Sequence, residues 1–286
     1  MEKETLNGAA LVLEGGGMRG LYTAGVLDRL MDSGLFFGYV IGVSAGASHA
    51  FSYLSWQRGR SRRINVDYCE RPDYMGLRCL LREGSFFGMD LLFRRIPYEL
   101  DPFDFGAYAR NPARFEMVVT NLRTGAAEYR GPRDPADALR VLQASCSLPF
   151  ASRPVTIDGD PFLDGGIADS IPVRRVLSRG TDRVVVVRTQ PRDFRKGTPE
   201  HMRLARFLYR RYPLFVRAME ERNDRYNDAL SLVEDLEREG RAIVISPQPQ
   251  PGLDRLERDP DRLDSLYQSG YADMGAVEAR VRDFAR

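Results

Sequence analysis

The stretch Gly42-Val43-Ser44-Ala45-Gly46 places a serine between two glycines with the spacing G-x-S-x-G. It follows the apolar run 39–41 and precedes a helical pattern over 47–57, so it predicts a strand, a sharp turn and a helix. Such a turn exposes the serine hydroxyl at a helix N-terminus, where free N–H groups favour negative charge. The pattern therefore predicts a nucleophile. The alternative is that Ser44 only caps the helix, because serine is a favoured N-cap residue.

A second glycine-rich stretch, Gly15-Gly16-Gly17-Met18-Arg19-Gly20, lies between the apolar run 9–14 and an amphipathic helical pattern. Closely spaced glycines let backbone N–H groups converge on one point, as an oxyanion hole requires. The stretch also matches the dinucleotide fingerprint, but the second strand ends in Val43-Ser44 and not in the acidic residue that would hold a ribose. A non-catalytic nucleotide-binding or lipid-binding protein that uses Gly15–Gly20 stays an alternative.

The base that would activate Ser44 has few candidates, since the chain has only two histidines, His49 and His201. The order Ser44, Asp164, His201 fits an α/β-hydrolase triad. However, His201 has the context of an ordinary residue in a first helical turn, and His49 lies more than one helical turn beyond the serine. A triad with His201 therefore stays the alternative to a carboxylate base.

Asp164-Gly165-Gly166 supplies that carboxylate, because it follows a short apolar strand and its glycines permit close backbone approach. A buried aspartate beside Ser44 could take the serine proton directly. The neighbouring aspartates Asp158, Asp160 and Asp169 are rivals, although turn formation is the plainer explanation for them.

Together these motifs resemble the patatin-like phospholipase family in their order and spacing, and the segment 144–150 resembles the family's segment ahead of the catalytic aspartate. The resemblance covers roughly residues 8–190 and leaves residues 195–286 outside it. It implies a lipid acyl hydrolase with a Ser–Asp dyad, acting on a lipid or phospholipid ester without a metal or organic cofactor. The site it implies consists of the nucleophile Ser44, the base Asp164, the oxyanion loop Gly15, Gly16, Gly17, Met18, Arg19 and Gly20, and the supporting glycines Gly42, Gly46, Gly165 and Gly166.

Two positions near these motifs depart from the family pattern or admit several roles. The family usually has Asp before the three glycines, where this chain has Glu14. We expect that change to alter support of the loop and not the chemistry. Arg19 either assists the oxyanion loop, meets an anionic headgroup or is solvated at the start of a helix.

The elements that position these motifs follow from periodicity. The first 57 residues read strand, loop, helix, strand, turn, helix, which predicts a parallel sheet covered by helices. Further strands are expected at 115–120, 126–130, 155–157, 183–188 and 242–245, with helices at 134–145, 200–238 (broken at Pro213) and 254–285. Residues 58–110 predict an irregular or short-helical excursion over the sheet. The predicted fold is a three-layer α/β/α domain with a central, mostly parallel sheet. It spans residues 1–286, and 195–286 form its mostly helical C-terminal part.

Composition limits the function classes. A formal net charge of +2 with 29% charged residues argues against a dedicated nucleic-acid binder. The three cysteines, Cys69, Cys79 and Cys146, lack metal-ligand spacing and favour a reducing compartment. The start of the chain has no signal-peptide pattern, and no apolar run approaches the ~20 residues of a membrane span. We therefore expect a cytoplasmic protein.

Peripheral membrane contact stays open because the stretches 86–95 and 206–212 combine aromatic and basic residues. Core-facing helices with a solvated basic side are the plainer explanation. The oligomeric state, and the choice between hydrolysis and acyl transfer, depend on features outside these motifs.

Overall fold

The computed structural model describes residues 3–132 and 134–286 and centres on a mixed sheet. Neighbouring strands from β10 to β5 pair in parallel, whereas β6, β7 and β8 pair antiparallel. These pairings confirm an α/β fold with a mostly parallel central sheet. Followed from one hydrogen-bonded partner to the next, the strands are β10 (Ala242–Ile245), β9 (Val184–Val187), β2 (Ala10–Leu13), β4 (Tyr39–Val43), β5 (Arg114–Asn121), β8 (Asp160–Asp164) and β7 (Val155–Ile157), with β6 (Ala127–Arg130) also paired to β5.

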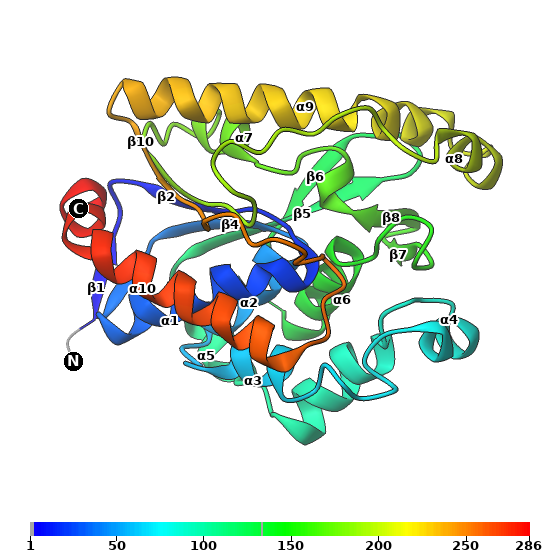
Figure 1. Cartoon of the computed structure of the whole chain (residues 1–286), viewed down its shortest axis with the longest axis horizontal. Helices are drawn as coiled ribbons and strands as arrows, with labels where there is room; N and C mark the ends of the chain where they lie inside the picture. Colours follow the sequence, from blue (N-terminus) through cyan, green and yellow to red (C-terminus); the bar gives the residue numbers. More distant parts are fainter. Residues whose placement is uncertain (1–2, 133) are drawn as a thin grey trace.

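Helices cover both faces of the sheet (Figure 1). Strand β2 shows why, because Leu11 and Leu13 enter one core while Ala10 and Val12 enter the other. A strand buried on both faces needs such a continuous apolar run. The first core is completed by α1 (Leu21–Asp32), α2 (Ala45–Leu54), α6 (Pro135–Ser145) and α10 (Pro260–Ala285), and the second by α7 (Val173–Leu177) and α9 (Pro213–Arg238).

Local signals set several helix boundaries. The Asp134 side chain accepts hydrogen bonds from the Ala136 and Asp137 N–H groups, which confirms the predicted cap of α6. Pro213 opens α9 after the separate helix α8 (Met202–Leu208), as the predicted break required. The expected helical start at residue 254 was wrong, because Asp259 caps α10 and Pro260 is its first residue. A residue before proline is disfavoured in helical conformation.

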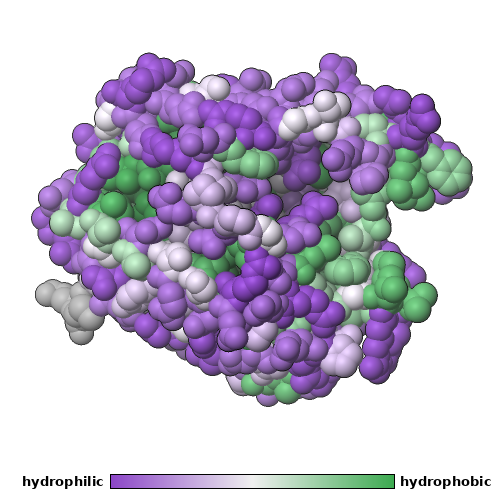
Figure 2. All heavy atoms as spheres, viewed as in Figure 1, coloured by the Kyte–Doolittle hydropathy of each residue, from purple (hydrophilic) through white to green (hydrophobic). Residues whose placement is uncertain are grey.

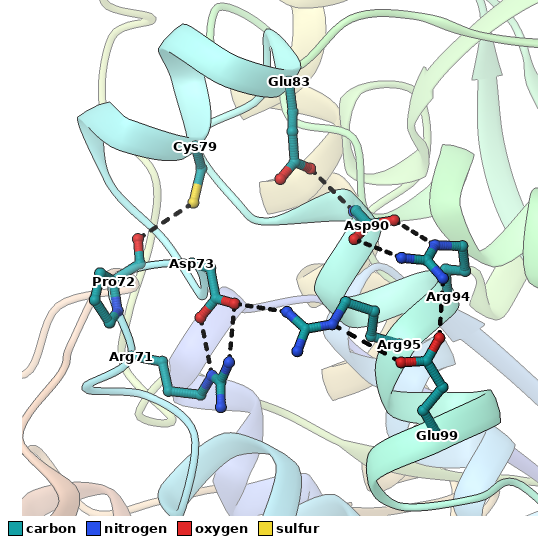
Figure 3. Close-up of polar contacts among 9 residues, drawn as sticks. All are labelled: Arg71, Pro72, Asp73, Cys79, Glu83, Asp90, Arg94, Arg95 and Glu99. Atoms are coloured by element: carbon teal, nitrogen blue, oxygen red, sulfur yellow. Dashed lines mark hydrogen bonds and ion pairs between the residues drawn. The ribbon is translucent and has the colours of Figure 1, made fainter.

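The excursion at 58–110 is short-helical, as predicted. It contains α3 (Arg60–Val66), α4 (Leu77–Glu83), the π-helix η2 (Leu91–Leu100) and α5 (Phe105–Arg110). Polar contacts tie α4 and the segment before it to η2 (Figure 3): the Asp90 N–H donates to Glu83 at 2.9 Å, and Arg95 pairs with Asp73 at 2.9 Å. Pro97 inside η2 lacks the N–H that a regular α-helix would use.

A second, two-stranded parallel sheet joins β1 (Glu4–Leu6) to β3 (Leu35–Phe37), and the pattern analysis did not predict it. Strands of three residues are too short to show alternation. Two 3-10 turns, η1 (Gly17–Gly20) and η3 (Gly165–Ile167), lie at the predicted motifs. In the described part of the chain, no helix has the length and apolar character needed to cross a membrane.

Candidate active site

Ser44 sits at the turn between β4 and α2, in the strand–turn–helix context that the motif predicted. Its φ of 52° lies in the left-handed region, which is a strained conformation for serine. A hydrogen bond from the Ser44 N–H to Ser145 Oγ (2.9 Å) holds this backbone, and Ser145 in turn donates to the Val118 carbonyl (2.7 Å). Ser145 was not among the predicted site residues, although the resemblance over 144–150 pointed to its segment.

The glycines of the serine motif are required by close contacts. A Cβ on Gly46 would lie 2.6 Å from the Leu13 carbonyl oxygen, and one on Gly42 would lie 2.7 Å from Ala47 Cα. The first contact presses the start of α2 against the end of β2, where the glycine loop begins. Packing therefore brings the two predicted motifs together.

Asp164 reaches the serine turn through the pairing of β5. Val43, the last residue of β4, lies opposite Val118, and Asp164, the last residue of β8, lies opposite the next residue, Val119. Strand β6 occupies the other edge of β5 over Met117–Thr120, so β4 and β8 share one edge and meet end to end. The antiparallel direction of β8 therefore places Asp164 next to the end of β4, which Ser44 follows.

The Asp164 side chain is buried, with 4% of its surface exposed. Its Oδ1 accepts the Gly166 N–H at 2.7 Å. Within the described residues, Oδ2 has no partner that meets standard hydrogen-bond geometry. Burial raises the pKa of this carboxyl, while the nearby Ser44 hydroxyl, acting as a hydrogen-bond donor, is the largest influence in the opposite direction. We take the Ser44–Asp164 contact to be close but imperfectly aligned, a common state of catalytic pairs without substrate.

The glycine loop lies directly against the serine. A Cβ on Gly15 would come within 3.1 Å of Ser44 Cβ, and Gly17 has a φ of +57°. Among the described residues, no acceptor is found for the Gly16 and Gly17 N–H groups. The Met18 N–H, by contrast, donates to the Arg255 carbonyl at 3.0 Å, so it is already engaged. Of the predicted oxyanion loop, Gly16 and Gly17 thus keep free donors.

Glu14, the residue directly before the glycine loop, anchors the start of this loop through hydrogen bonds. It is buried, and its two oxygens accept the Thr189 N–H (2.8 Å) and the Tyr226 hydroxyl (2.6 Å). These bonds join the end of β2 to the segment after β9 and to α9. The result agrees with the expectation that Glu14 acts in support of the loop.

Arg19 is half-buried beside the loop, and burial lowers its pKa while the Glu14 carboxylate opposes that effect. With the Gln190 amide oriented to satisfy both groups, its oxygen accepts from Arg19 Nη1 at 3.0 Å. Arg19 is therefore not a freely solvated side chain.

The histidines lie elsewhere. The His201 side chain is 72% exposed, and its imidazole lies 3.8 Å from Glu200. His49 is buried on α2 beneath η1, where a Cβ on Gly20 would lie 2.9 Å from its Nε2, and burial lowers its pKa to about 4. Neither imidazole has a described contact with Ser44 or Asp164, so the structure does not assemble the triad alternative.

The rival aspartates also have other partners. Asp158 is exposed and pairs with Arg130, and Asp160 pairs with Arg123 at 2.7 Å. Asp169 is enclosed on the α7 side and accepts the Tyr129 hydroxyl at 2.8 Å; burial raises its pKa to about 6.

Three basic residues outside the predicted site lie near the dyad or its glycine loop, and the motif analysis missed them. Arg222 of α9 donates from Nε to the Gly166 carbonyl at 2.7 Å. Lys196 stacks its Nζ 3.9 Å from the Tyr226 ring centre, and burial, followed by repulsion from Arg222, lowers its pKa to about 7. Arg255 lies beside the glycine loop, where its carbonyl accepts the Met18 N–H and its Cβ would lie 3.4 Å from a Cβ on Gly17. All three lie at residues that match none of the site motifs, so no sequence signal marked them.

A cavity of about 530 Å³ lies between η2, α6 and β7 and is lined by Met89, Phe93, Leu139 and Val155 among others. Ser147 borders it, and the Ser147 carbonyl accepts the Asp164 N–H at 2.8 Å. The cavity therefore adjoins the site through one backbone contact but does not include Ser44 or Asp164. Within residues 3–132 and 134–286, no group of three or more His, Cys, Asp or Glu residues is arranged to hold a metal ion.

Two protein-family models match separate parts of the chain. A family model described as patatin-like phospholipase matches residues 11–177. A second model, described as a domain of unknown function (DUF6363), matches residues 212–286 and so includes α9 and α10.

Individual relatives in sequence match about two thirds of the chain. The chain is 33% identical over 192 residues to the uncharacterized protein YjjU of Escherichia coli strain K12, covering 64% of this chain and 52% of that protein. It is 27% identical over 188 residues to lysophospholipase nte1 of Emericella nidulans, covering 62% of this chain and 12% of that protein. The chain thus spans about half the length of the first relative and far less of the second. The solved structure of VipD from Legionella pneumophila aligns over 95% of this chain and 67% of that one, with 16% identity and a TM-score of 0.46.

Proposed function

Because the chain belongs to the patatin-like phospholipase family, we propose that it is a serine acyl hydrolase acting on lipid or phospholipid carboxyl esters. The observation that carries this proposal is the buried Asp164 carboxylate, whose Oδ2 has no hydrogen-bond partner in the described structure and which the Ser44 hydroxyl approaches. A buried acceptor without a partner costs free energy, and it persists where chemistry needs it.

The reaction proceeds in two halves. Ser44 Oγ attacks the ester carbonyl and its proton passes to Asp164, which gives a tetrahedral oxyanion. Collapse breaks the bond to the alcohol, which leaves with the proton from Asp164. Water then attacks the acyl-enzyme, again giving its proton to Asp164. As the carboxylic acid departs, Asp164 returns the proton to Ser44.

The oxyanion is proposed to sit on the glycine loop. Gly16 and Gly17 offer N–H groups that no described residue accepts, and Gly15 presses this loop against Ser44. The loss of one such donor typically slows acyl transfer by ~10²–10³-fold. The engaged Met18 N–H supports the shape of the loop and does not bind the oxyanion.

A fluorophosphonate probe and a short p-nitrophenyl ester test this assignment. We expect the probe to label Ser44 and ester turnover to be lost in both Ser44→Ala and Asp164→Asn, with both variants folded by circular dichroism. His201→Ala is the matched control and should retain turnover. Labelling that survives Ser44→Ala, or normal turnover by Asp164→Asn, would refute the dyad.

We further propose peripheral contact with a lipid surface through the tips of α4 and α8. Leu77 and Leu81 on α4 are 72% and 87% exposed, and Phe207 on α8 is 65% exposed. Figure 2 shows apolar side chains gathered on two projections, at the places where Figure 1 draws α8 and α4, with a notch between them. Isolated exposed apolar residues are ordinary, but clusters of them mark interaction surfaces.

Backbone contacts connect these two tips to the segment that adjoins the dyad. The Phe150 N–H donates to the Tyr209 hydroxyl at the end of α8 (3.0 Å), and the Phe86 N–H, after α4, donates to the Ala151 carbonyl (2.6 Å). The loop with Phe150 and Ala151 is therefore bonded to both tips. It follows Ser147, whose carbonyl accepts the Asp164 N–H. Arginines beside the apolar residues, Arg78, Arg82, Arg203 and Arg210, suit an anionic surface.

Vesicle co-sedimentation tests the contact. Leu81→Ser and Phe207→Ser should each reduce binding to vesicles that contain phosphatidylglycerol, because each removes an apolar side chain from the interface. Leu100→Ser, at the opposite end of η2 from α4, replaces another exposed leucine and should bind normally. Equal binding by all three variants would exclude this surface.

A reducing compartment such as the cytoplasm is proposed on separate grounds. Cys69, Cys79 and Cys146 are all free thiols. Proteins of oxidising compartments rarely leave several thiols unpaired. Cell fractionation combined with thiol labelling in situ would test this location.

A further inference from the structure

Arg222 and Lys196 approach the dyad from the C-terminal part of the chain. Arg222 projects from α9 and binds the carbonyl of Gly166, two residues from the proposed base. Lys196 lies in the segment after β9, which Asn227 of α9 holds through two hydrogen bonds to the Lys196 backbone (3.0 and 2.9 Å). Both cations are close enough to Asp164 to stabilise its charged form.

Arg222 and Lys196 differ from the remaining arginines of α9. Arg217 and Arg225 both pair with Glu221, and Arg238 pairs with Asp235, so each has a carboxylate partner on its own helix. Over the described ranges, neither Lys196 nor Arg222 forms a salt bridge, although both are half-buried. A half-buried cation without a direct carboxylate partner is unusual, since desolvation normally demands one.

In the described structure, the nearby carboxylates of Glu14 and Asp164 form no hydrogen bond with the Lys196 or Arg222 side chain. Both oxygens of Glu14 already accept bonds from Thr189 and Tyr226. Asp164 Oδ1 accepts the Gly166 N–H, and Oδ2 is the atom that the proposed reaction assigns to the Ser44 proton. The donors of Lys196 and most donors of Arg222 therefore remain available to a ligand.

The cations also repel one another. Arg222 lowers the pKa of Lys196, and Arg255 and Arg19 each lower the pKa of Arg222, after the larger effect of burial. Repulsion between like charges that the fold holds close together destabilises the folded protein, and a bound anion offsets this repulsion. Several cations from separate segments suit a tetrahedral anion with more than one charge better than a carboxylate, because guanidinium and ammonium groups can each bind a different oxygen.

We infer that Lys196, Arg222 and Arg255 form an anion subsite, which the chain beyond the patatin-like match adds to the dyad and which binds the phosphate group of the ester substrate. This inference rests on the proposed function. It assigns a role to the part of the chain outside the patatin-like match, namely the choice of substrates that carry a phosphate close to the scissile ester.

Two esters with the same acyl chain test the inference, lysophosphatidic acid and the neutral 1-monoacylglycerol. Lys196→Met and Arg255→Met should each lower the ratio of kcat/KM for the phosphate ester over the neutral ester by about 10- to 100-fold, the value of a lost charged hydrogen bond. Both changes leave the backbone contacts of these residues in place. Arg225→Met, which removes an arginine of α9 that is paired with Glu221, is the matched control and should leave the ratio unchanged.

Inorganic phosphate separates a headgroup site from a site for free phosphate. It should inhibit the wild-type protein competitively against lysophosphatidic acid, and more weakly in Lys196→Met. If wild-type protein binds phosphate but hydrolyses both esters equally well, the subsite does not serve the substrate and the inference fails. The inference also fails if the variants slow both esters by the same factor, since the cations would then only support Asp164.

Failure of the proposed function would look different. In that case the wild-type protein would hydrolyse neither ester, or hydrolysis would survive Ser44→Ala. Arg222→Met adds a further check, because loss of its bond to Gly166 should slow both esters, with a greater loss for the phosphate ester.

Discussion

Asp164 illustrates how a residue's surroundings set its chemistry. Four aspartates lie between 158 and 169, yet only Asp164 ends a buried strand next to Ser44. Desolvation moves its pKa upward and so makes it a stronger base than an exposed aspartate. A carboxylate with that property can do the work that imidazole does in a three-residue relay.

The pH dependence of ester turnover follows from this shift. Asp164 must be ionised to accept the Ser44 proton, and burial places its pKa above the ordinary 3.8, against the opposing influence of Ser44, Gly166, Arg222 and Lys196. On a neutral p-nitrophenyl ester, kcat/KM should therefore rise with increasing pH through an apparent pKa above 3.8.

Asp169 is the control for this acid limb, because burial also raises the pKa of this second carboxyl, in its case to about 6. Asp169→Asn should retain the limb if Asp164 is the base. A limb at or below the ordinary carboxyl value, or one that disappears in Asp169→Asn, would contradict the assignment.

At the scale of elements, the site depends on three strand ends. The end of β2 begins the glycine loop, the end of β4 carries Ser44, and the end of β8 carries Asp164. Gly46 holds the first two together, because its missing side chain lets α2 start against the carbonyls of Leu13 and Glu14.

Gly46→Ala should therefore disrupt the site. The new Cβ would lie 2.6 Å from the Leu13 oxygen and 2.8 Å from the Glu14 oxygen, so the backbone must move. We expect a loss of ~1–3 kcal/mol in the free energy of unfolding, measured by urea denaturation, together with slower ester turnover. Gly197→Ala, where a Cβ would meet nothing within 4 Å, should change neither. A fully stable and active Gly46→Ala would show that this contact is not needed.

Helix α9 connects the elements of the site from the other face of the sheet. Tyr226 donates to the buried Glu14 at 2.6 Å, and Arg222 binds the Gly166 carbonyl. Tyr226→Phe leaves a carboxylate oxygen of Glu14 unpaired and should lower stability by about 1–3 kcal/mol.

Tyr271→Phe is the comparison for Tyr226→Phe. Its hydroxyl donates to Asp32 at 3.0 Å, but Asp32 also pairs with Arg58 near the surface. Chemical denaturation of both variants should show the smaller loss for Tyr271→Phe. An equal loss would mean that Glu14 finds another donor when the tyrosine hydroxyl is removed.

At the scale of the whole molecule, we propose that residues 1–286 form a single domain. Strand β10 extends the central sheet beside β9, and α10 packs against α1. The two helices approach so closely that a Cβ on Gly25 would lie 2.0 Å from the backbone carbonyl oxygen of Tyr267. A Cβ on Gly270 would likewise lie 2.0 Å from the backbone carbonyl oxygen of Tyr22. Tyr267 also donates to the buried Asp28 at 2.7 Å.

A single domain should unfold in one cooperative transition. Calorimetry of the full chain should give equal calorimetric and van't Hoff enthalpies. Removal of residues 260–286 should prevent folding, because α10 buries Leu263, Tyr267 and Met274 against α1 and the sheet. Two separate transitions, or a stable truncated protein, would indicate that the C-terminal segment is an independent unit.

The sequence by itself determined the local features of this protein. Apolar runs located the strands of the parallel sheet, and the motifs at Gly15–Gly20 and Gly42–Gly46 located the loop and the serine turn. These features were predictable because each depends on neighbouring residues, through burial on both strand faces and through the space that glycine leaves.

Tertiary structure alone decided which distant groups meet at the serine. Asp164 lies next to Ser44 because β8 runs antiparallel along the same edge of β5 that β4 occupies, a pairing that no local pattern specifies. The same is true of Lys196, Arg222 and Tyr226, which reach the site only because α9 packs across the face of the sheet. Such contacts depend on strand order and helix packing, which the periodicity of a single chain does not encode.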